Sequence, residues 1–254
     1  MKKIIISAAV ILIAVIITAN WFFHTPHGLY EKAFTVGSSV CHQIPSHSYE
    51  VSGIQFPLCA RCSGLYLGSF IGLAYYLTQG RKKALPTKGF SLLLLIFFLI
   101  WAGDGVNSFT TDFLNKTILY ETTNTTRLIT GFGMGLVMST ALVTLFNLTV
   151  WQDGKNQPLL HNLLQVVAYT VASGIIALIL LSADAIYFQF LAYISIATVM
   201  IIITLLYAIF WMILLKKENS FAKWSSLGLF LTAGFASALL QITLLTMLRQ
   251  WAIG

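Results

Sequence analysis

About seven apolar stretches make up most of this chain, and each is long enough to cross the hydrocarbon core of a bilayer. An apolar run of about 18 or more residues spans the roughly 30 Å of hydrocarbon as a helix. The stretches lie at residues 4–22, 60–79, 90–108, 127–149, 159–181, 187–215 and 224–247. We therefore predict an all-α fold, a polytopic bundle of about seven transmembrane helices.

The composition supports this fold class and argues against two others. Of the 254 residues, 57% are hydrophobic and only 9% are charged, whereas a soluble domain carries about 25% charged residues. The net charge of +7 is not gathered into the basic, aromatic-containing patch of a nucleic-acid-binding protein. The lipid bilayer is therefore the expected partner, and no nucleic acid is expected.

The chain divides into three expected regions. Residues 1–23 are predicted to be a retained N-terminal membrane anchor. The apolar run after Lys2 and Lys3 is followed by bulky aromatic residues, where a signal peptide has small residues at its cleavage site. Residues 24–149 combine a loop containing Cys and His with three spans, and they hold the predicted site. Residues 150–254 hold three more spans with few polar groups.

Basic residues are distributed unevenly between alternate loops. Cytoplasmic loops are enriched in lysine and arginine, and this bias sets the orientation of a membrane protein. One set of loops holds Lys2, Lys3, Arg81, Lys82, Lys83, Lys88, Lys155, Lys216, Lys217 and Lys223. The other set holds half as many: Lys32, Arg61, Lys116, Arg127 and Arg249. We predict a multi-pass plasma membrane protein with a cytoplasmic N-terminus and with residues 24–58 on the extracytoplasmic side.

Three cysteines and a histidine lie in this outer loop and at the start of the span that follows it: Cys41, His42, Cys59 and Cys62. Three thiolates and one imidazole are a common ligand set for zinc. The sequence therefore predicts a metal site made by these four residues, with zinc as the metal.

The fourth ligand and the metal itself have alternatives. His47, Asp104 or a water molecule could take the place of His42, because His42 adjoins Cys41 and both can bind one ion only through an unusual local turn. A Cys-x-x-Cys pair also occurs in redox proteins, and disulfides persist on the oxidising side of a membrane. A helix start at Cys59 and the charge of Arg61 would both favour a thiolate.

Two ionisable residues at the ends of other spans are predicted to face the same site. Such residues usually face the protein interior or a water-filled cavity and are often functional. We predict that Asp104 is a metal ligand or a general base and that Arg127 binds an anionic group, because its planar fork can hold two oxygens. A structural ion pair between Asp104 and Arg127 is the alternative.

Small residues recur at four-residue spacing in two of the predicted helices: Gly64, Gly68 and Gly72 in one, Gly131 and Gly135 in the other. Such stripes let two helix backbones approach closely. Packing through these faces would turn Arg127, which is in register with Gly131, toward the end of the helix that carries the cysteines.

The chain resembles bacterial and archaeal predicted membrane proteins grouped as domain of unknown function 2085. The resemblance covers about residues 36–145. Its motifs are Cys41-His42-Gln43, the run from Pro57 to Gly68 that contains Cys59-Ala60-Arg61-Cys62, Asp104-Gly105, and Asn124-x-x-Arg127 with Thr130-Gly131. It implies a polytopic membrane protein and implies no established activity.

Function therefore has to be argued from the site. The first hypothesis is a zinc-dependent membrane enzyme that acts at the outer leaflet on a lipid, a lipid-linked substrate or an anionic small molecule, with Asp104 and Arg127 as its catalytic residues. Zinc lowers the pKa of bound water to about 7. The alternatives are a non-enzymatic binding or transport protein with a structural metal or disulfide, and a membrane thiol-disulfide oxidoreductase.

Overall fold

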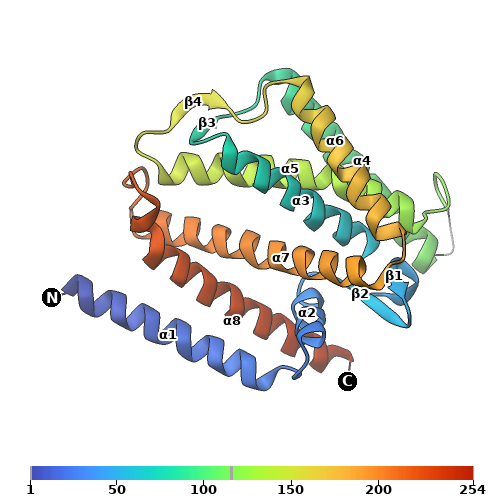
Figure 1. The fold of residues 1–254 in the computed structure, drawn as a ribbon, viewed down its shortest axis with the longest axis horizontal. Helices are drawn as coiled ribbons and strands as arrows, with labels where there is room; N and C mark the ends of the chain where they lie inside the picture. Colours follow the sequence, from blue (N-terminus) through green and yellow to red (C-terminus); the bar gives the residue numbers. More distant parts are fainter. Residues whose placement is uncertain (1, 115–116, 254) are drawn as a thin grey trace.

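The computed structural model describes residues 2–114 and 117–253 and is mainly helical (Figure 1). Its α-helices are α1 (Lys2–His24), α2 (Leu29–Ser38), α3 (Ala60–Thr78), α4 (Lys88–Leu114), α5 (Asn124–Val150), α6 (Leu163–Leu181), α7 (Ala185–Leu214) and α8 (Gly228–Ile253). Short elements connect them: the 3-10 helices η1 (Pro45–His47) and η2 (Trp224–Leu227), and the strands β1 (Ser48–Val51), β2 (Ile54–Cys59), β3 (Lys82–Ala84) and β4 (Lys155–Pro158).

The predicted all-α, polytopic bundle is confirmed, since a long helix overlaps most of each predicted apolar stretch. Within the described ranges, six helices are long and apolar enough to cross a membrane: α1, α4, α5, α6, α7 and α8. α3 is not in this set. It carries Arg61, serines and glycines, and it buries much of its surface inside the bundle. The division into three regions stays a prediction.

The glycine faces of α3 and α5 pack against each other, as the sequence predicts. A Cβ atom on Gly64 would lie 2.2 Å from the carbonyl oxygen of Leu128, and one on Gly131 would lie 2.2 Å from that of Arg61. Neither position has room for a side chain. The close approach fixes the first turn of α5 beside the first turn of α3, which carries Cys62.

The remaining long helices form a second group below α3 and α5 in Figure 1, where α7 is followed by α8 and then by α1. α7 packs against both α3 and α5 and joins the two groups. α2 lies at the lower right, between the end of α1 and the hairpin of β1 and β2. The predicted loop 24–58 is therefore an ordered cap made of a helix, a 3-10 turn and a hairpin.

The two ends of the bundle differ in charge and in structure. At one end, β3 pairs with β4 and Trp151 bridges to Phe221, so three basic connections lie together. At the other end, β1 and β2 form an antiparallel hairpin through a tight turn at Ser52 and Gly53, both with positive φ. The predicted polar site belongs to this hairpin end.

Candidate metal centre

The segment around Cys41 is held against β2 by backbone contacts that its sequence makes possible. Gly37 leaves room for the carbonyl of Pro57, which would lie 2.1 Å from an added Cβ. The buried amide of Gln43 donates hydrogen bonds of 2.8 Å to the carbonyls of Phe34 and Pro57. These contacts bring Cys41 beside Cys59, although 18 residues separate them.

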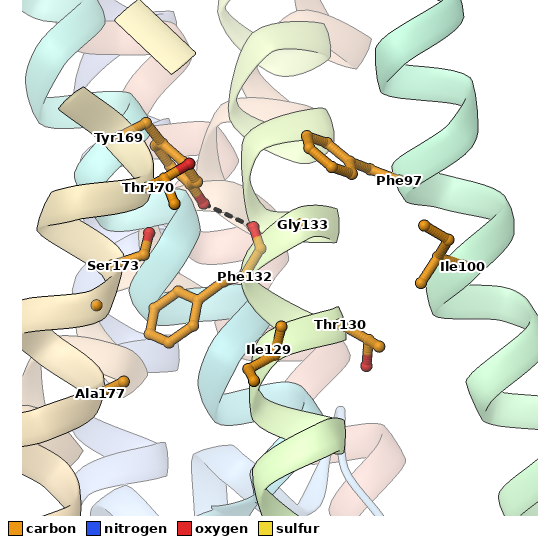
Figure 2. A pocket seen from close by; sticks show the side chains of 11 residues that line it. Phe97, Ile100, Ile129, Thr130, Phe132, Gly133, Tyr169, Thr170, Ser173 and Ala177 are labelled. Atoms are coloured by element: carbon orange, nitrogen blue, oxygen red, sulfur yellow. Dashed lines mark hydrogen bonds between the residues drawn. The ribbon is translucent and has the colours of Figure 1, made fainter. Parts of the chain in front are cut away.

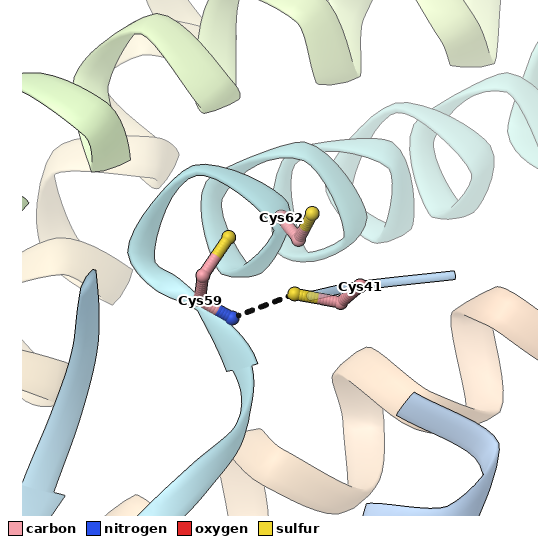
Figure 3. A group of neighbouring side chains, drawn as sticks. All are labelled: Cys41, Cys59 and Cys62. Carbon is pink, nitrogen blue, oxygen red and sulfur yellow. Dashed lines mark hydrogen bonds between the residues drawn. The ribbon is translucent and has the colours of Figure 1, made fainter. Parts of the chain in front are cut away.

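The three cysteine sulfurs form one compact group (Figure 3). They lie within 4.8 Å of one another, and the backbone N–H of Cys59 donates a hydrogen bond of 3.1 Å to Cys41 Sγ. All three cysteines of the chain are described, and none forms a disulfide. Cys59 precedes the first residue of α3, and hydrogen bonds from Cys41 and Cys62 hold its pKa well below the ordinary value. Within the group, Cys59 is therefore the cysteine that favours the thiolate form.

His42 extends this group on its solvent side. Its Nδ1 atom lies 3.6 Å from Cys41 Sγ, and the side chain is exposed. Hydrogen bonds to Cys41 and Cys59 raise the pKa of His42 to about 9. The electron-rich sulfurs that favour a proton on this ring would also attract a metal cation.

A chain of hydrogen bonds runs from His42 into the protein. His42 Nε2 lies 3.1 Å from His47 Nδ1, and His47 Nε2 lies 3.1 Å from Asp112 Oδ2. Burial, followed by the charge of Arg127, lowers the pKa of His47. A neutral His47 can accept a hydrogen bond from His42 and donate one to Asp112, which leaves Nδ1 of His42 free to act as a ligand.

Arg127 lies beside Asp112, at the inner end of this series of hydrogen bonds. Its guanidinium donates hydrogen bonds of 3.0 Å to Asn124 Oδ1 and 2.9 Å to Ser108 Oγ, and it lies 3.6 Å from Asp112 Oδ2. Ser108 also donates to Asp112, at 3.1 Å. Arg127 is buried and lies at the cysteine end of α3, and its terminal nitrogens contact protein groups.

The alternative ion pair between Asp104 and Arg127 is wrong, because Asp104 pairs with Arg61. Arg61 Nε donates a hydrogen bond of 2.9 Å to Asp104 Oδ2, and Thr130 donates to the same oxygen. Tyr120 donates to Oδ1 at 2.6 Å. Burial and the bond to Asp104 raise the pKa of Tyr120 to about 12. The sequence predicted that the charge of Arg61 would favour a cysteine thiolate. In the structure this charge is paired with Asp104 instead.

Asp104 itself joins four segments and is buried, with a side chain 0% exposed. Among residues 2–114 and 117–253, the group of side chains close enough to share a metal ion consists of Cys41, Cys59 and Cys62, and it includes neither His42 nor Asp104. Polar residues of α3, α4 and α5 thus meet at one end of the bundle in two neighbouring clusters, and Arg61 of α3 belongs to the second.

An apolar cavity of about 370 Å³ lies between α4, α5 and α6 (Figure 2). Thr130 contributes to its wall and so connects it to Asp104, while Phe97 and Phe132 supply aromatic surface. Tyr169 crosses from α6 and donates a hydrogen bond of 2.7 Å to the carbonyl of Phe132. None of the predicted metal ligands lines this cavity.

Arg249, near the end of α8, contacts the backbone of the Cys41–His42 segment, a role that the sequence did not predict. Its guanidinium donates hydrogen bonds to the carbonyls of Cys41 at 2.6 Å, His42 at 2.7 Å and Ser38 at 3.1 Å. An arginine two residues beyond the predicted span 224–247 was the available signal, but hydropathy does not reveal which loop it reaches.

Asp112 and Tyr120 were also missed as site residues. Asp112 follows Ser108 by four residues, which places both on one face of α4, and this spacing was the signal that could have identified it. Tyr120 lies outside any helix. Asn107 positions its segment by donating a hydrogen bond of 2.6 Å to the carbonyl of Tyr120.

Comparison with known proteins agrees with these features. A family described as "Predicted membrane protein (DUF2085)" matches residues 41–141. An uncharacterized protein of Methanocaldococcus jannaschii is 30% identical over 124 residues, 48% of this chain and 73% of that protein. One of Methanothermobacter thermautotrophicus is 30% identical over 106 residues, 41% of this chain and 86% of that protein. No solved structure matches. The chain belongs to the DUF2085 family of membrane proteins.

Proposed function

We propose that this protein is a zinc-binding membrane protein in which Cys41, His42, Cys59 and Cys62 hold one zinc ion. The observation that carries the proposal is the group of three sulfurs within 4.8 Å, completed by a histidine nitrogen 3.6 Å from Cys41 Sγ. Cys₃His is a usual ligand set of structural zinc. Bound there, the ion would join the outer cap to α3.

The surroundings of His42 support its place as the fourth ligand. A histidine that binds a metal usually donates its other ring N–H to a neighbouring group, which fixes the tautomer and the ring orientation. His47 and Asp112 supply such a partner chain. His47 is therefore assigned to orienting His42, and Asp112 to orienting His47.

A non-enzymatic binding or transport protein with a structural metal fits this geometry best. Three thiolates donate much charge to zinc and leave it a weak Lewis acid, and four protein ligands leave no open position for water. Asp104 and Arg127 engage protein groups and are assigned to holding α3, α4 and α5 together.

A zinc-dependent enzyme acting on a lipid or lipid-linked substrate is the second candidate. The exposure of His42 favours it, because an exposed ligand can exchange with water. Cobalt substituted for zinc distinguishes the two candidates. If adding azide to the cobalt protein leaves its visible spectrum unchanged, the four protein ligands fill the coordination sphere and the metal is structural. If azide shifts the spectrum as it does in open sites, the fourth position is available for catalysis.

Orientation in the membrane belongs to the same proposal. The basic connections lie together at the end of the bundle opposite the hairpin, as the positive-inside bias requires. We assign that end to the cytoplasm, with the N-terminus, and the cysteine end to the extracytoplasmic side. Labelling of an introduced cysteine in a cysteine-free variant, at Ser46 or at Gln152, with a membrane-impermeant maleimide on intact cells tests this. Labelling at Gln152 and not at Ser46 would show that the protein has the opposite orientation.

Metal analysis of the purified protein tests the zinc centre itself. We expect about one zinc per chain, lost in Cys59→Ser and weakened in His42→Gln. His161→Gln is the matched control, because His161 lies near the other end of the bundle and should leave the zinc content unchanged. A metal-free protein with a reducible disulfide between Cys59 and Cys62 would reject the zinc centre and favour the thiol-disulfide oxidoreductase.

A further inference from the structure

A groove lies on the face of the molecule formed by α1, α2, α7 and α8. It has a volume of about 450 Å³, and its wall is almost wholly apolar, from Tyr193 near the cap to Met200 and Phe235 deeper in the bundle. A second groove of about 670 Å³ continues it between α1 and α8 and shares Thr18 and Phe22 with it.

One end of this groove holds a buried lysine. Lys32, in the first turns of α2, is only 7% exposed and lines the groove. Its Nζ atom donates hydrogen bonds of 2.7 Å to the carbonyl of Phe22 and to Thr25 Oγ1. It also lies 4.3 Å from the centre of the Phe22 ring and 5.4 Å from that of Trp21.

Lys32 lacks an anionic partner in the part of the chain that the structure describes, where each ion pair involves other residues. A buried charge is costly unless an opposite charge accompanies it. The carbonyl of Phe22 and the hydroxyl of Thr25 satisfy hydrogen bonds but do not neutralise the ammonium. An anion from outside the chain would complete this environment.

Trp21 adds a second donor at the same place. Its Nε1 atom is buried and has no hydrogen-bond acceptor among residues 2–114 and 117–253, and its ring lines the groove beside Lys32. A buried indole N–H usually finds a partner. One end of the groove therefore has a buried lysine and an unpaired indole N–H beside it, and the rest of its length is hydrocarbon surface.

We propose that this groove binds an anionic glycerophospholipid, with the phosphate at Lys32 and Trp21 and an acyl chain along α1, α7 and α8. The helices that form most of the wall are apolar enough to cross a membrane, so lipid is the molecule that surrounds them. Lys32 follows the end of α1 at the hairpin end of the bundle. This places a cation at headgroup level and the apolar wall at chain level, which is the polarity of a phospholipid.

The competing explanation is that Lys32 only caps α1. A lysine commonly binds the last carbonyls of a helix, and the contact with Phe22 is of this kind. A cap contributes stability but has no preference for a headgroup. Headgroup selectivity, measured separately from stability, therefore distinguishes the two roles.

The test uses the purified full-length protein incubated with equimolar dioleoyl phosphatidylglycerol and dioleoyl phosphatidylcholine and analysed by native mass spectrometry. We expect the protein to retain the anionic lipid at least about fivefold over the zwitterionic one, the factor that one lysine near an anionic lipid supplies. Lys32→Met should remove the preference, and Lys32→Arg should keep it. Trp21→Phe, which removes the indole N–H and also reduces the ring to a phenyl group, should weaken retention of both lipids.

Two further arms separate the groove from the charge. Ala197 is exposed and lines the groove, so Ala197→Phe should fill it and reduce retention of both lipids. Ala8, exposed on α1 outside the groove, supplies the matched control Ala8→Phe. Glycerol 3-phosphate, which has the phosphate but no chain, should not compete with the lipid.

Equal retention of the two lipids by the wild-type protein would overturn the proposal, as would a preference that survives in Lys32→Met. Competition by glycerol 3-phosphate as strong as that by the lipid would show that a free phosphate suffices. The site does not depend on the zinc proposal, because zinc content should be equal in all these variants. A protein without zinc that still selects the anionic lipid would reject only the metal centre.

Discussion

A histidine next to a cysteine in sequence can ligate the same ion only if the backbone turns sharply between them. Here the two side chains do approach each other, with His42 Nδ1 3.6 Å from Cys41 Sγ. The chain bends immediately after the pair, where Gln43 adopts a φ of 55°. Its buried amide stabilises this conformation through the carbonyls of Phe34 and Pro57. The Cys41-His42-Gln43 motif is therefore understandable residue by residue: a thiol, an imidazole, and an amide that fixes the bend.

Replacing Asp112 tests the chain of partners behind His42. Asp112→Asn removes the carboxylate that accepts from His47, so His42 loses its fixed orientation. We expect zinc affinity to fall by roughly 10–100-fold, as is usual when such a partner is removed. Competition with a chromogenic chelator measures the change. Asp153→Asn, which alters an exposed ion pair with Arg81, is the control, and an equal effect in both variants would contradict the assigned role of Asp112.

Replacing Asp104 tests a structural role. Asp104→Asn leaves the guanidinium of Arg61 largely buried without its counter-charge, and losing one partner of a buried pair costs about 3–5 kcal/mol. Denaturant unfolding in detergent should show this loss, with zinc still bound in the folded fraction. The idea fails if the variant is as stable as wild type and releases its zinc, since Asp104 would then act on the metal.

At the scale of elements, the site depends on helices that are distant in sequence. α3 supplies Cys62 and Arg61, and α5 supplies Arg127 from a helix start capped by Thr123. The glycine stripes of α3 and α5 let the two helix backbones pack in direct contact. α8 supplies Arg249, which donates hydrogen bonds to the backbone carbonyls of Cys41 and His42, two of the predicted ligands.

Arg249→Ala should loosen this segment without touching a ligand side chain. Charge-assisted hydrogen bonds are each worth about 1.5–3 kcal/mol, so we expect zinc to bind about tenfold more weakly. In the metal-free protein, alkylation of Cys41 should be faster than in wild type. Arg249→Lys should restore part of the effect, and Gln250→Ala, one residue further along α8, should behave as wild type. Unchanged alkylation and unchanged affinity would exclude the positioning role.

At the scale of the whole molecule, the proposed metal couples the outer cap to the stability of the bundle. A ligand that binds only the folded state stabilises it by about 4.1 kcal/mol at 1,000 times its Kd. The bundle should therefore unfold at a lower temperature after treatment with a chelator. The Cys59→Ser variant should not respond to the chelator. A wild-type Tm that does not change on chelation would separate the metal from folding.

The apolar stretches by themselves determined the bundle, because the length and hydropathy of a span are local properties and the bilayer demands helices from them. They placed each long helix within six residues of its observed ends, as for 127–149 against Asn124–Val150 and 90–108 against Lys88–Leu114. The cysteines and the histidine also stood out locally, and the glycine spacing indicated which two helices pack.

Only the tertiary structure decided which carboxylate pairs with which arginine. Asp104 and Arg127 were both expected near the site, but the rotation of α4 turns Asp104 to Arg61 and Asp112 to Arg127. The reach of Arg249 and the burial of Lys32 depend in the same way on where α8 and α1 pack. A side chain's partner is set by helix rotation and by contacts across hundreds of residues, and neither is encoded in a local pattern of hydropathy.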